Sequence, residues 1–387
     1  MIRKFLPVGQ GAFYLEQFPE YVPEGGGRIN VVYDCGSLSG IHLVHNQIDR
    51  CFSPNEKIQA VFLSHFDKDH VNGLEYLLKH YQVEHIFFPL LTTEDKAFIR
   101  LRQLVKRASA DEHAFWLRFA LDPSETLSQM GLEYVPTLHP VSSGDSDDED
   151  PGLYNTAERP YPWPRVQVVP SGANVFDTVR GFAKGPAREA DWFYIPFNFR
   201  ETENREILKI MLNKALGTRN PEELLELLKD EPSSRAAIKK AYGKVPGTLN
   251  SNSMTLFSGT KSEHLVGILD SPRCLCGGCY CMMADGVLYL GDYEASGQQK
   301  WTQLEKAYHE YFPFTGCLQV PHHGSKDNFN PKLLELEACR LYFISAGVNN
   351  KHKHPDGGVI KQIMLSGKCP SIVTEQPWSE ITMSIAL

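Results

Sequence analysis

The sequence predicts an α/β protein, and three observations support this fold class. An apolar run at 58–64 is typical of a buried strand, and it ends at His65. Apolar side chains then recur at helical spacing across 69–80, which predicts an amphipathic helix. A second apolar run at 84–91 predicts another strand. Strand, loop, helix and strand therefore alternate, as they do in α/β folds.

Length and composition exclude several classes of protein. The chain has 387 residues, which at about 150 residues per domain leaves room for two domains or one large domain with insertions. With 42% apolar and 22% charged residues, neither a disordered chain nor a disulfide miniprotein fits. The formal net charge of −8 argues against binding nucleic acid through overall charge, but it permits a local basic patch.

The sequence also predicts where the protein resides. Every apolar run falls short of the roughly 18 to 20 residues that a membrane helix needs. The N-terminal segment has too few apolar residues before Pro7 to form a secretory signal. The nine cysteines are an odd number, and five are scattered singly, which suits reduced thiols. We therefore expect a cytoplasmic protein with no membrane segment.

The remaining elements are predicted in chain order. Residues 29–33 form a strand that ends at the polar residues 34–37, and residues 95–119 carry a basic amphipathic pattern. That pattern predicts either a solvated helix face or a wall that contacts phosphates. Residues 201–242 predict a helical insertion. Further strands are expected at 253–257, 264–269, 287–291, 317–321 and 341–345, and further helices at 293–311 and 331–338.

A dense cluster of metal-ligand side chains lies at 65–70, directly after the first strand described above. His65, Asp67, Asp69 and His70 place two imidazoles and two carboxylates within six residues. Because a loop lets alternate side chains converge, the first pair is expected at one metal position and the second pair at another. The alternative is a charged helix N-terminus in which Asp69 only caps the helix.

Further motifs follow one another along the chain. They are Val8-Gly9-Gln10-Gly11, Tyr33-Asp34-Cys35-Gly36, Asn252-Ser253, Leu290-Gly291-Asp292, Val320-Pro321-His322-His323-Gly324-Ser325, and Ser345-Ala346-Gly347 followed by His354-Pro355. With the 65–70 cluster, which fits H-x-[HD]-x-D-H, they resemble the metallo-β-lactamase-fold hydrolases. Within that superfamily the sequence is most similar to the soluble hydrolase domain of the ComEC competence proteins. The resemblance covers residues 1–90 and 250–370.

The resemblance implies a four-layer αββα metallo-β-lactamase sandwich with a helical and loop insertion. We expect residues 1–91 to form the first half of this domain, 92–250 a variable insertion, and 251–387 the second half. ComEC proteins are membrane channels to which such a domain is attached. Since this sequence shows no membrane span, the resemblance does not imply transport.

The resemblance also implies a centre for two divalent metal ions, Zn²⁺ or Mn²⁺. The implied metal ligands are His65, Asp67, Asp69, His70, Asp292 and His322. Asp292 ends an apolar strand, where a rigid carboxylate is placed to bridge two ions, and His322 supplies the last imidazole. Asp67 stands where a histidine is commoner, which makes the first site harder and favours Mn²⁺ without excluding Zn²⁺.

One ligand of the wider superfamily is not evident. Many members place a further histidine between the first motif and the Gly-Asp, and here His113 and His139 are the candidates. Both are more typical of a surface or core histidine, so we expect the first metal to be weakly held. Because only one of the neighbours His322 and His323 can face a given ion, His323 is left to act as an acid or to orient substrate.

The implied function is a metal-dependent hydrolase that cleaves a phosphodiester, in DNA or a nucleotide, through a metal-bridging hydroxide. Asp69 would orient that hydroxide, and His323 or His354 would protonate the leaving oxygen. Four side chains near the site are expected to contact substrate phosphates, namely Ser325, Lys326, Lys351 and Lys353. Their charge is local, so this role is compatible with the net charge of −8.

Two alternatives remain open. The motif specifies metal chemistry and not the substrate, so a hydrolase of another ester, a thioester or a lactone also fits. The chain would otherwise be a non-catalytic protein in a multi-gene defence or competence system, with 92–250 as the surface that binds a protein partner. The intact motif argues against this second alternative.

Four cysteines form a separate cluster, namely Cys274, Cys276, Cys279 and Cys281. A Gly-Gly pair at the centre of the cluster predicts a two-residue hairpin in which the inner two cysteines pair and the outer two pair. The period of two in a strand places all four sulfurs on one face. Structural zinc, buried free thiols and disulfides all fit this arrangement.

Overall fold

The structure is a computed structural model of the 387-residue chain. The described part of the chain comprises residues 1–19, 28–106, 114–143, 160–179, 182, 191–200, 203–218, 220, 223–224, 236–238, 240–241, 252–262, 266–270 and 282–387.

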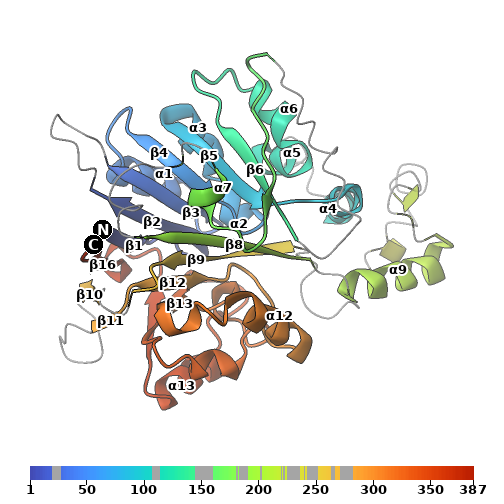
Figure 1. Cartoon of the computed structure of the whole chain (residues 1–387). Coiled ribbons are helices and arrows are strands. Elements are labelled where there is room, and N and C mark those ends of the chain that lie inside the picture. The colour runs from blue at the N-terminus through green and yellow to red at the C-terminus, as the bar shows by residue number, and fades with distance from the viewer. Residues whose placement is uncertain are drawn as a thin grey trace.

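Two β-sheets form the centre of the molecule (Figure 1). The strands of the first sheet are β1 (Ile2–Phe5), β2 (Gly11–Phe18), β3 (Ile29–Ser37), β4 (Lys57–Phe62), β5 (Gln82–Pro89), β6 (Thr137–Ser142), β7 (Val169–Pro170), β10 (Val266–Asp270), β11 (Met282–Ala284) and β16 (Ile381–Ile385). Those of the second are β8 (Phe193–Arg200), β9 (Asn252–Gly259), β12 (Gly286–Tyr289), β13 (Thr315–Gln319), β14 (Leu341–Ser345) and β15 (Cys369–Val373). In the described residues the strand orders are β11-β10-β16-β1-β2-β3-β4-β5-β6-β7 and β15-β14-β13-β12-β9-β8.

Helices lie over the outer faces of both sheets and beside them. The helices of the described residues are α1 (Ile41–Cys51), α2 (Lys68–Val71), α3 (Leu74–His80), α4 (Thr93–Lys106), α5 (Phe115–Leu121), α6 (Pro123–Ser128), α7 (Val175–Thr178), α9 (Glu203–Leu216), α12 (Gln298–Tyr308) and α13 (Gly357–Leu365). The apolar faces of α1, α3 and α5 share a core with the ten-stranded sheet, and those of α12 and α13 share one with the six-stranded sheet. The predicted αββα sandwich is confirmed, because a third core lies between the two sheets.

Aromatic side chains fill the space between the sheets. Tyr14 and Tyr33 from the first sheet stack on Tyr289 of the second, with ring centroids 5.6 and 4.6 Å apart. Phe5 stacks on Phe343 in the same way, with centroids 3.8 Å apart. Alternate residues of these strands point to this inner core, as the period of two in a strand requires.

A buried ion pair within the first sheet makes further hydrogen bonds to the second. The guanidinium of Arg3 donates from Nε to Oε1 of Glu16 over 2.8 Å, and both side chains are almost wholly inaccessible to solvent. Arg3 donates further to the Asp285 carbonyl, and Glu16 accepts from the Tyr289 hydroxyl of the opposite sheet. Because a buried charge is costly unless paired and hydrogen-bonded, this network favours one relative placement of the sheets.

The helix predicted over 69–80 is interrupted, and a glycine explains the interruption. Gly73 separates α2 from α3, and its N–H donates to the carbonyl of Cys35 on β3 over 2.8 Å. A Cβ at this position would lie 2.8 Å from the Cys35 carbonyl oxygen, so glycine allows the helix to approach the strand this closely. The sequence predicted the helical residues correctly and missed the break.

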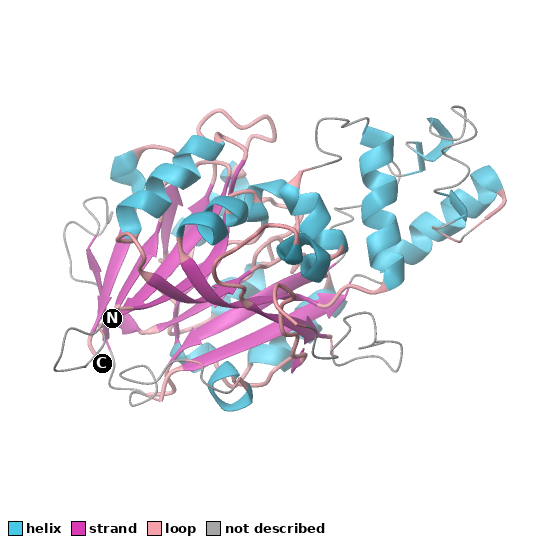
Figure 2. Ribbon diagram, turned by 90° about the horizontal axis from the view of Figure 1, so that it is seen from above, coloured by secondary structure: helices cyan, strands magenta, loops and turns pink. Residues whose placement is uncertain are grey.

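Residues 92–250 contribute to the sandwich as well as to helices beside it. The strands β6, β7 and β8 come from this range and pair within the two sheets. Its helices α4 and α9 pack together through Phe98, Leu101, Leu208 and Leu212. In Figure 2 helices stand apart from the strands on the right, the side where Figure 1 places α9. The division of the chain at 91 and 250 stays a prediction.

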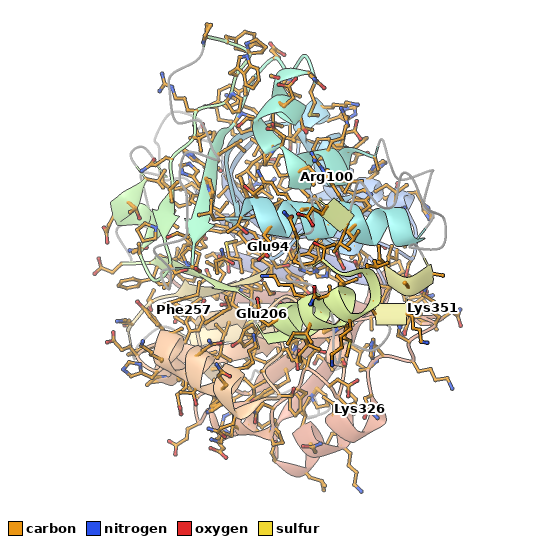
Figure 3. The ribbon with its side chains drawn as sticks, turned by 90° about the vertical axis from the view of Figure 1, so that its right-hand side faces the viewer. Glu94, Arg100, Glu206, Phe257, Lys326 and Lys351 are labelled. Atoms are coloured by element: carbon orange, nitrogen blue, oxygen red, sulfur yellow. The ribbon has the colours of Figure 1, made fainter. Side chains whose placement is uncertain are left out.

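Helix α4 is tied to α9 by charge as well as by apolar contact. Lys209 Nζ on α9 lies 2.6 Å from Oε1 of Glu94 on α4 and 2.9 Å from Oε1 of Glu206. Figure 3 shows Glu94 and Glu206 facing the viewer from these two helices, with Arg100 further along α4.

Among the described residues, no helix is both long enough and apolar enough to cross a membrane.

Candidate metal centre

The candidate centre lies where the carboxyl ends of strands from both sheets meet. His65, Asp292 and His322 each follow a strand at the same interval, three residues after the ends of β4, β12 and β13. β12 and β13 run parallel, so their ends lie at one edge of the sheet. The Ser64 carbonyl accepts the N–H of Met254 in the other sheet over 2.7 Å, which brings the two sets of loops together.

Asp292 is the carboxylate that three imidazoles face. Its Oδ2 lies 3.5 Å from Nε2 of His65 and 3.6 Å from Nε2 of His322. Its Oδ1 lies 3.5 Å from Nε2 of His70. The side chain of Asp292 is only 5% exposed, so water contributes little to its solvation. His65, His70 and Asp292 together form a group that could hold a metal ion.

A second group forms around Asp69. Oδ2 of Asp69 lies 3.2 Å from Nε2 of His323, and His70 completes the group, whose ligand atoms are within 4.8 Å of one another. The Asp69 side chain is 14% exposed, more than that of Asp292. The described residues therefore contain two adjacent groups of histidine and aspartate suited to metal ions.

Every imidazole of the centre has its Nδ1 atom held by a hydrogen-bond acceptor. Nδ1 of His70 lies 2.8 Å from Asp34 Oδ2, and Nδ1 of His323 lies 2.7 Å from the Ser345 carbonyl. Neither acceptor carries a proton to donate, so both Nδ1 atoms are protonated. The lone pair of each ring is therefore on Nε2, which faces a carboxylate.

The same reasoning shows which ring nitrogen carries the proton in His65 and His322. Ser64 Oγ donates to Asp34 Oδ2 over 2.7 Å, so it can only accept from His65 Nδ1, 2.9 Å away. Asn328 donates its Nδ2 hydrogen to the Asp292 carbonyl, so its Oδ1 accepts from His322 Nδ1 over 2.9 Å. All four Nε2 lone pairs consequently point at carboxylate oxygens, and only a cation or added protons can make these contacts favourable.

Buried polar atoms without partners support a cation here. Nε2 of His65, Nε2 of His70 and Oδ1 of Asp292 are inaccessible to water, and none has a hydrogen-bond partner in the described part of the chain. Unpaired buried polar atoms are costly, so their convergence on one point indicates a ligand. Imidazole nitrogen and carboxylate oxygen are the donors that Zn²⁺ and Mn²⁺ accept.

The charges of the carboxylates agree with this chemistry. Burial alone would raise the pKa of Asp292, but the imidazoles of His322 and His65 hold that pKa well below its usual range. Burial also acts to raise the pKa of Asp69, but an added proton on Nε2 of His323, which would donate to the carboxylate, outweighs burial and lowers that pKa. Both carboxylates are therefore ionised at neutral pH, as metal ligands must be.

Two glycines make room for the centre. A Cβ on Gly36 would lie 2.5 Å from the backbone carbon of Asp69, so the motif Asp34-Cys35-Gly36 lets β3 touch the metal-binding loop. Gly291 has a φ of +53°, and a Cβ there would lie 2.6 Å from Ser64 Cβ. These glycines allow the loops before Asp69 and Asp292 to approach the sheet closely.

Other predicted site residues lie around the centre or apart from it. Asp67 precedes α2 as its N-cap residue and belongs to neither metal group. The ring of His354 lies 5.7 Å from that of His322, and burial together with the neighbouring imidazoles lowers the pKa of His354 to about 4. Ser325 is buried, and its Oγ accepts the N–H of Asp327. The predicted phosphate contacts Lys326, Lys351 and Lys353 are exposed.

The histidines considered for the missing ligand lie elsewhere. His139 is buried on β6, stacks on Phe87 and lies 3.0 Å through Nε2 from Nδ1 of His85. Burial lowers its pKa to about 3, which is the behaviour of a core histidine. His113 and the four cysteines at 274–281 lie outside the described residues.

Sequence reasoning missed the residues that orient the ligands. Asp34, Ser64, Asn328 and Ser345 fix the four Nδ1 atoms, yet the sequence pattern placed none of them in the site. Asp34 carried a signal, since it is a polar residue at the end of an apolar strand. The partners of Asn328 and Ser345 become visible only once the strands are assembled.

Comparisons with known proteins add little to this description. No protein-family model matches the chain, and no curated protein matches it. Fifteen chains of solved structures match, among them Zn²⁺-bound PqqB from Methylobacterium extorquens, a metallo-β-lactamase-fold protein. It is 8% identical, with a TM-score of 0.42 over 99% of each chain. This likeness is weak, so the fold assignment rests on the chain's own sheets and helices, and the similarity to ComEC domains stays a prediction.

Proposed function

We propose that this protein is a hydrolase that depends on two divalent metal ions, Zn²⁺ or Mn²⁺, and cleaves phosphodiesters in DNA or nucleotides. One observation carries the metal-dependent part. Four imidazoles have Nδ1 tied to an acceptor and Nε2 aimed at the carboxylates of Asp69 and Asp292. Six side chains that face one another through acceptor atoms are suited to cations and to little else.

The residues have distinct roles in this proposal. Bound divalent ions would supply Lewis acidity and a water of lowered pKa. Asp292, buried and facing three imidazoles, would hold the ions, whereas the more exposed Asp69 would orient the attacking water. His354 is neutral at pH 7 because its pKa is about 4, so it fits hydrogen bonding to substrate better than donation of a proton.

Local positive charge supports a phosphodiester as the substrate. Lys326 follows the His322 turn, and Lys351 and Lys353 lie in the loop that carries His354. All three side chains are exposed, and Figure 3 shows Lys326 and Lys351 at the surface. Cations beside a metal centre attract an anionic substrate, even though the net charge of the chain is −8.

The decisive experiment combines metal analysis with cleavage assays. The purified protein should contain up to two transition-metal ions per chain and cleave single-stranded DNA, duplex DNA, RNA or bis(nitrophenyl) phosphate. Asp69→Ala should lose metal and activity together. A protein that binds no metal after incubation with Zn²⁺ or Mn²⁺, or an Asp69→Ala variant with full metal content and the parent's rate, would refute the proposal.

An acyl substrate is the second candidate, and exposed apolar side chains favour it. Leu38 and Val348 are 53% and 58% exposed. The N–H of Leu38 and that of Gly347, the residue before Val348, both donate to Gln10. The Gln10 turn leads into Gly11, which touches the backbone of Asp69. Apolar groups beside the centre suit an ester, thioester or lactone. Hydrolysis of such compounds, with no cleavage of any phosphodiester, would replace the first candidate with this one.

A further inference from the structure

His322 and His323 are neighbours in sequence, yet they face different carboxylates. Nε2 of His322 lies 3.6 Å from Oδ2 of Asp292, and Nε2 of His323 lies 3.2 Å from Oδ2 of Asp69. The two ring centroids are 5.9 Å apart, with planes inclined by 61°. The pair therefore spans the centre and does not approach a single point.

An unusual backbone turn places the pair in this way. His322, His323 and Gly324 have φ angles of 48°, 55° and 81°, so three consecutive residues lie in the left-handed region. Residues with a side chain seldom adopt this region, because Cβ comes close to the following carbonyl oxygen. The turn is held by hydrogen bonds from His322 N to the Gly291 carbonyl and from Asp356 N to the Gly324 carbonyl, each 3.0 Å long. Strain held in this way is typical of a functional site.

The two carboxylate oxygens of Asp292 face different imidazoles. Oδ2 faces His65 and His322, whereas Oδ1 faces His70. A neutral imidazole has one lone pair on Nε2, so each ring can bind only one ion. His70 is also grouped with Asp69 and His323. His70 is common to both groups, and its one lone pair can serve only one ion. If His70 belongs with Asp69 and His323, Asp292 is the residue left to be shared, through its two oxygens.

We propose that the consecutive residues His322 and His323 are divided between two metal ions. His322 joins His65 and Oδ2 of Asp292 around the first ion, and His323 joins the remaining imidazole, Asp69 and Oδ1 of Asp292 around the second. This inference rests on the proposed metal centre. In it, His322 takes the place of the histidine that the sequence lacks between the two motifs. His323 becomes a ligand, which removes it from the role of acid.

Paired histidine variants test the division through metal content. Each single variant, His322→Ala and His323→Ala, should retain about one tightly bound ion. The double variant His65→Ala with His322→Ala should also retain one ion, because both residues belong to the first set of ligands. The double variant His65→Ala with His323→Ala should retain no tightly bound ion, because it removes a ligand from each set. Metal is counted after dialysis against a chelator of moderate strength.

A spectroscopic measurement gives a second readout. With Mn²⁺, the parent should show the coupled signal of a two-ion centre in electron paramagnetic resonance. His322→Ala and His323→Ala should each show the signal of an isolated ion instead. Glutamine variants at both positions, which keep more of the side-chain volume, repeat the test if the alanine variants fold poorly. His309→Ala, at an exposed position after α12, is the matched control and should bind metal as the parent does.

The outcomes separate this inference from the proposed function. A parent that binds no metal refutes the metal centre itself. A parent with two ions, together with a His65 and His323 double variant that keeps one, refutes only the division. The division is also refuted if His323→Ala keeps two ions and the coupled signal.

Discussion

Asp34 accepts a hydrogen bond from His70, with 2.8 Å between Oδ2 and Nδ1, and both side chains are wholly buried. Asp34 accepts two further hydrogen bonds from the backbone N–H and the hydroxyl of Ser64, each 2.7 Å long. Its φ of 55° is uncommon for a residue with a side chain. Asp34, in this uncommon backbone conformation, thus orients His70 and Ser64, two adjacent parts of the candidate metal centre.

Asp34→Ala should weaken metal binding while the metal ligands themselves stay in place. The Nδ1 hydrogen of His70 would lose its acceptor, and changes to such orienting partners typically reduce metal affinity by about 10- to 100-fold. Competition with a chromophoric chelator measures the affinity, and urea unfolding measures the accompanying loss of stability. Asp34→Asn keeps an acceptor oxygen and should fall between the parent and the alanine variant. Equal affinity in all three proteins would contradict this role.

Asp292→Asn should leave the fold intact and lower metal occupancy. The substitution keeps the shape of the side chain but removes the negative charge that three Nε2 atoms face. We expect affinity at least about tenfold weaker, with an unchanged circular dichroism spectrum. If the variant holds two ions as tightly as the parent, another residue bridges them.

Acid should destabilise the protein through His139. Its pKa is about 3 in the folded state, against about 6.5 in an unfolded chain. Between these values the unfolded state binds more protons, so the free energy of unfolding falls by up to about 1.4 kcal/mol per pH unit as pH decreases from about 6.5. Denaturant unfolding at pH 7, 6, 5 and 4 measures this slope.

The contribution of His139 is isolated by a variant that does not titrate. His139→Gln should show a shallower loss of stability between pH 6.5 and 4 than the parent, since the amide binds no proton in this range. His309→Gln, at an exposed histidine, should follow the parent. Identical slopes for the parent and His139→Gln would assign the acid sensitivity to other groups.

The combined change of Lys326, Lys351 and Lys353 to Ala should raise KM for nucleic acid several-fold. It should also flatten the dependence of binding on salt, because each lost phosphate contact reduces the logarithmic slope by about 0.7 to 0.9. Metal content should not change. A matched triple variant of Lys79, Lys306 and Lys361, on the outer helices α3, α12 and α13, should behave as the parent does. Equal salt slopes for both triple variants would show that the first three lysines take no part in binding.

The sequence predicted most of the local structure but not how the strands are ordered. Each apolar run at 58–64 and 84–91 contains a strand, β4 and β5, because burial on both faces leaves a continuous apolar signal. The position of β16 between β1 and β10 was not predictable. Strand order depends on contacts between residues nearly 380 positions apart, for which a local pattern carries no information.

The sequence likewise predicted only part of the candidate centre. The motif brought His65, Asp69 and His70 to attention because ligands close in sequence leave a dense pattern, and the structure brings them together with Asp292. Asp67 belongs to that pattern but to neither metal group, since spacing alone does not fix where a side chain points. His322 and His323 point in different directions because of the positive φ angles at 322–324, and the presence of two histidines in the sequence does not predict those angles.

The place of β16 in the ten-stranded sheet also bears on how the chain avoids aggregation. β16 pairs with β1 on one side and with β10 on the other, so it stands between these two strands in the sheet. Until residues 381–385 dock, β1 and β10 each present a row of unpaired backbone groups to other chains. A partly folded chain that lacked this strand would expose both edges, so its tendency to associate with other chains would depend on how early the C-terminal strand docks.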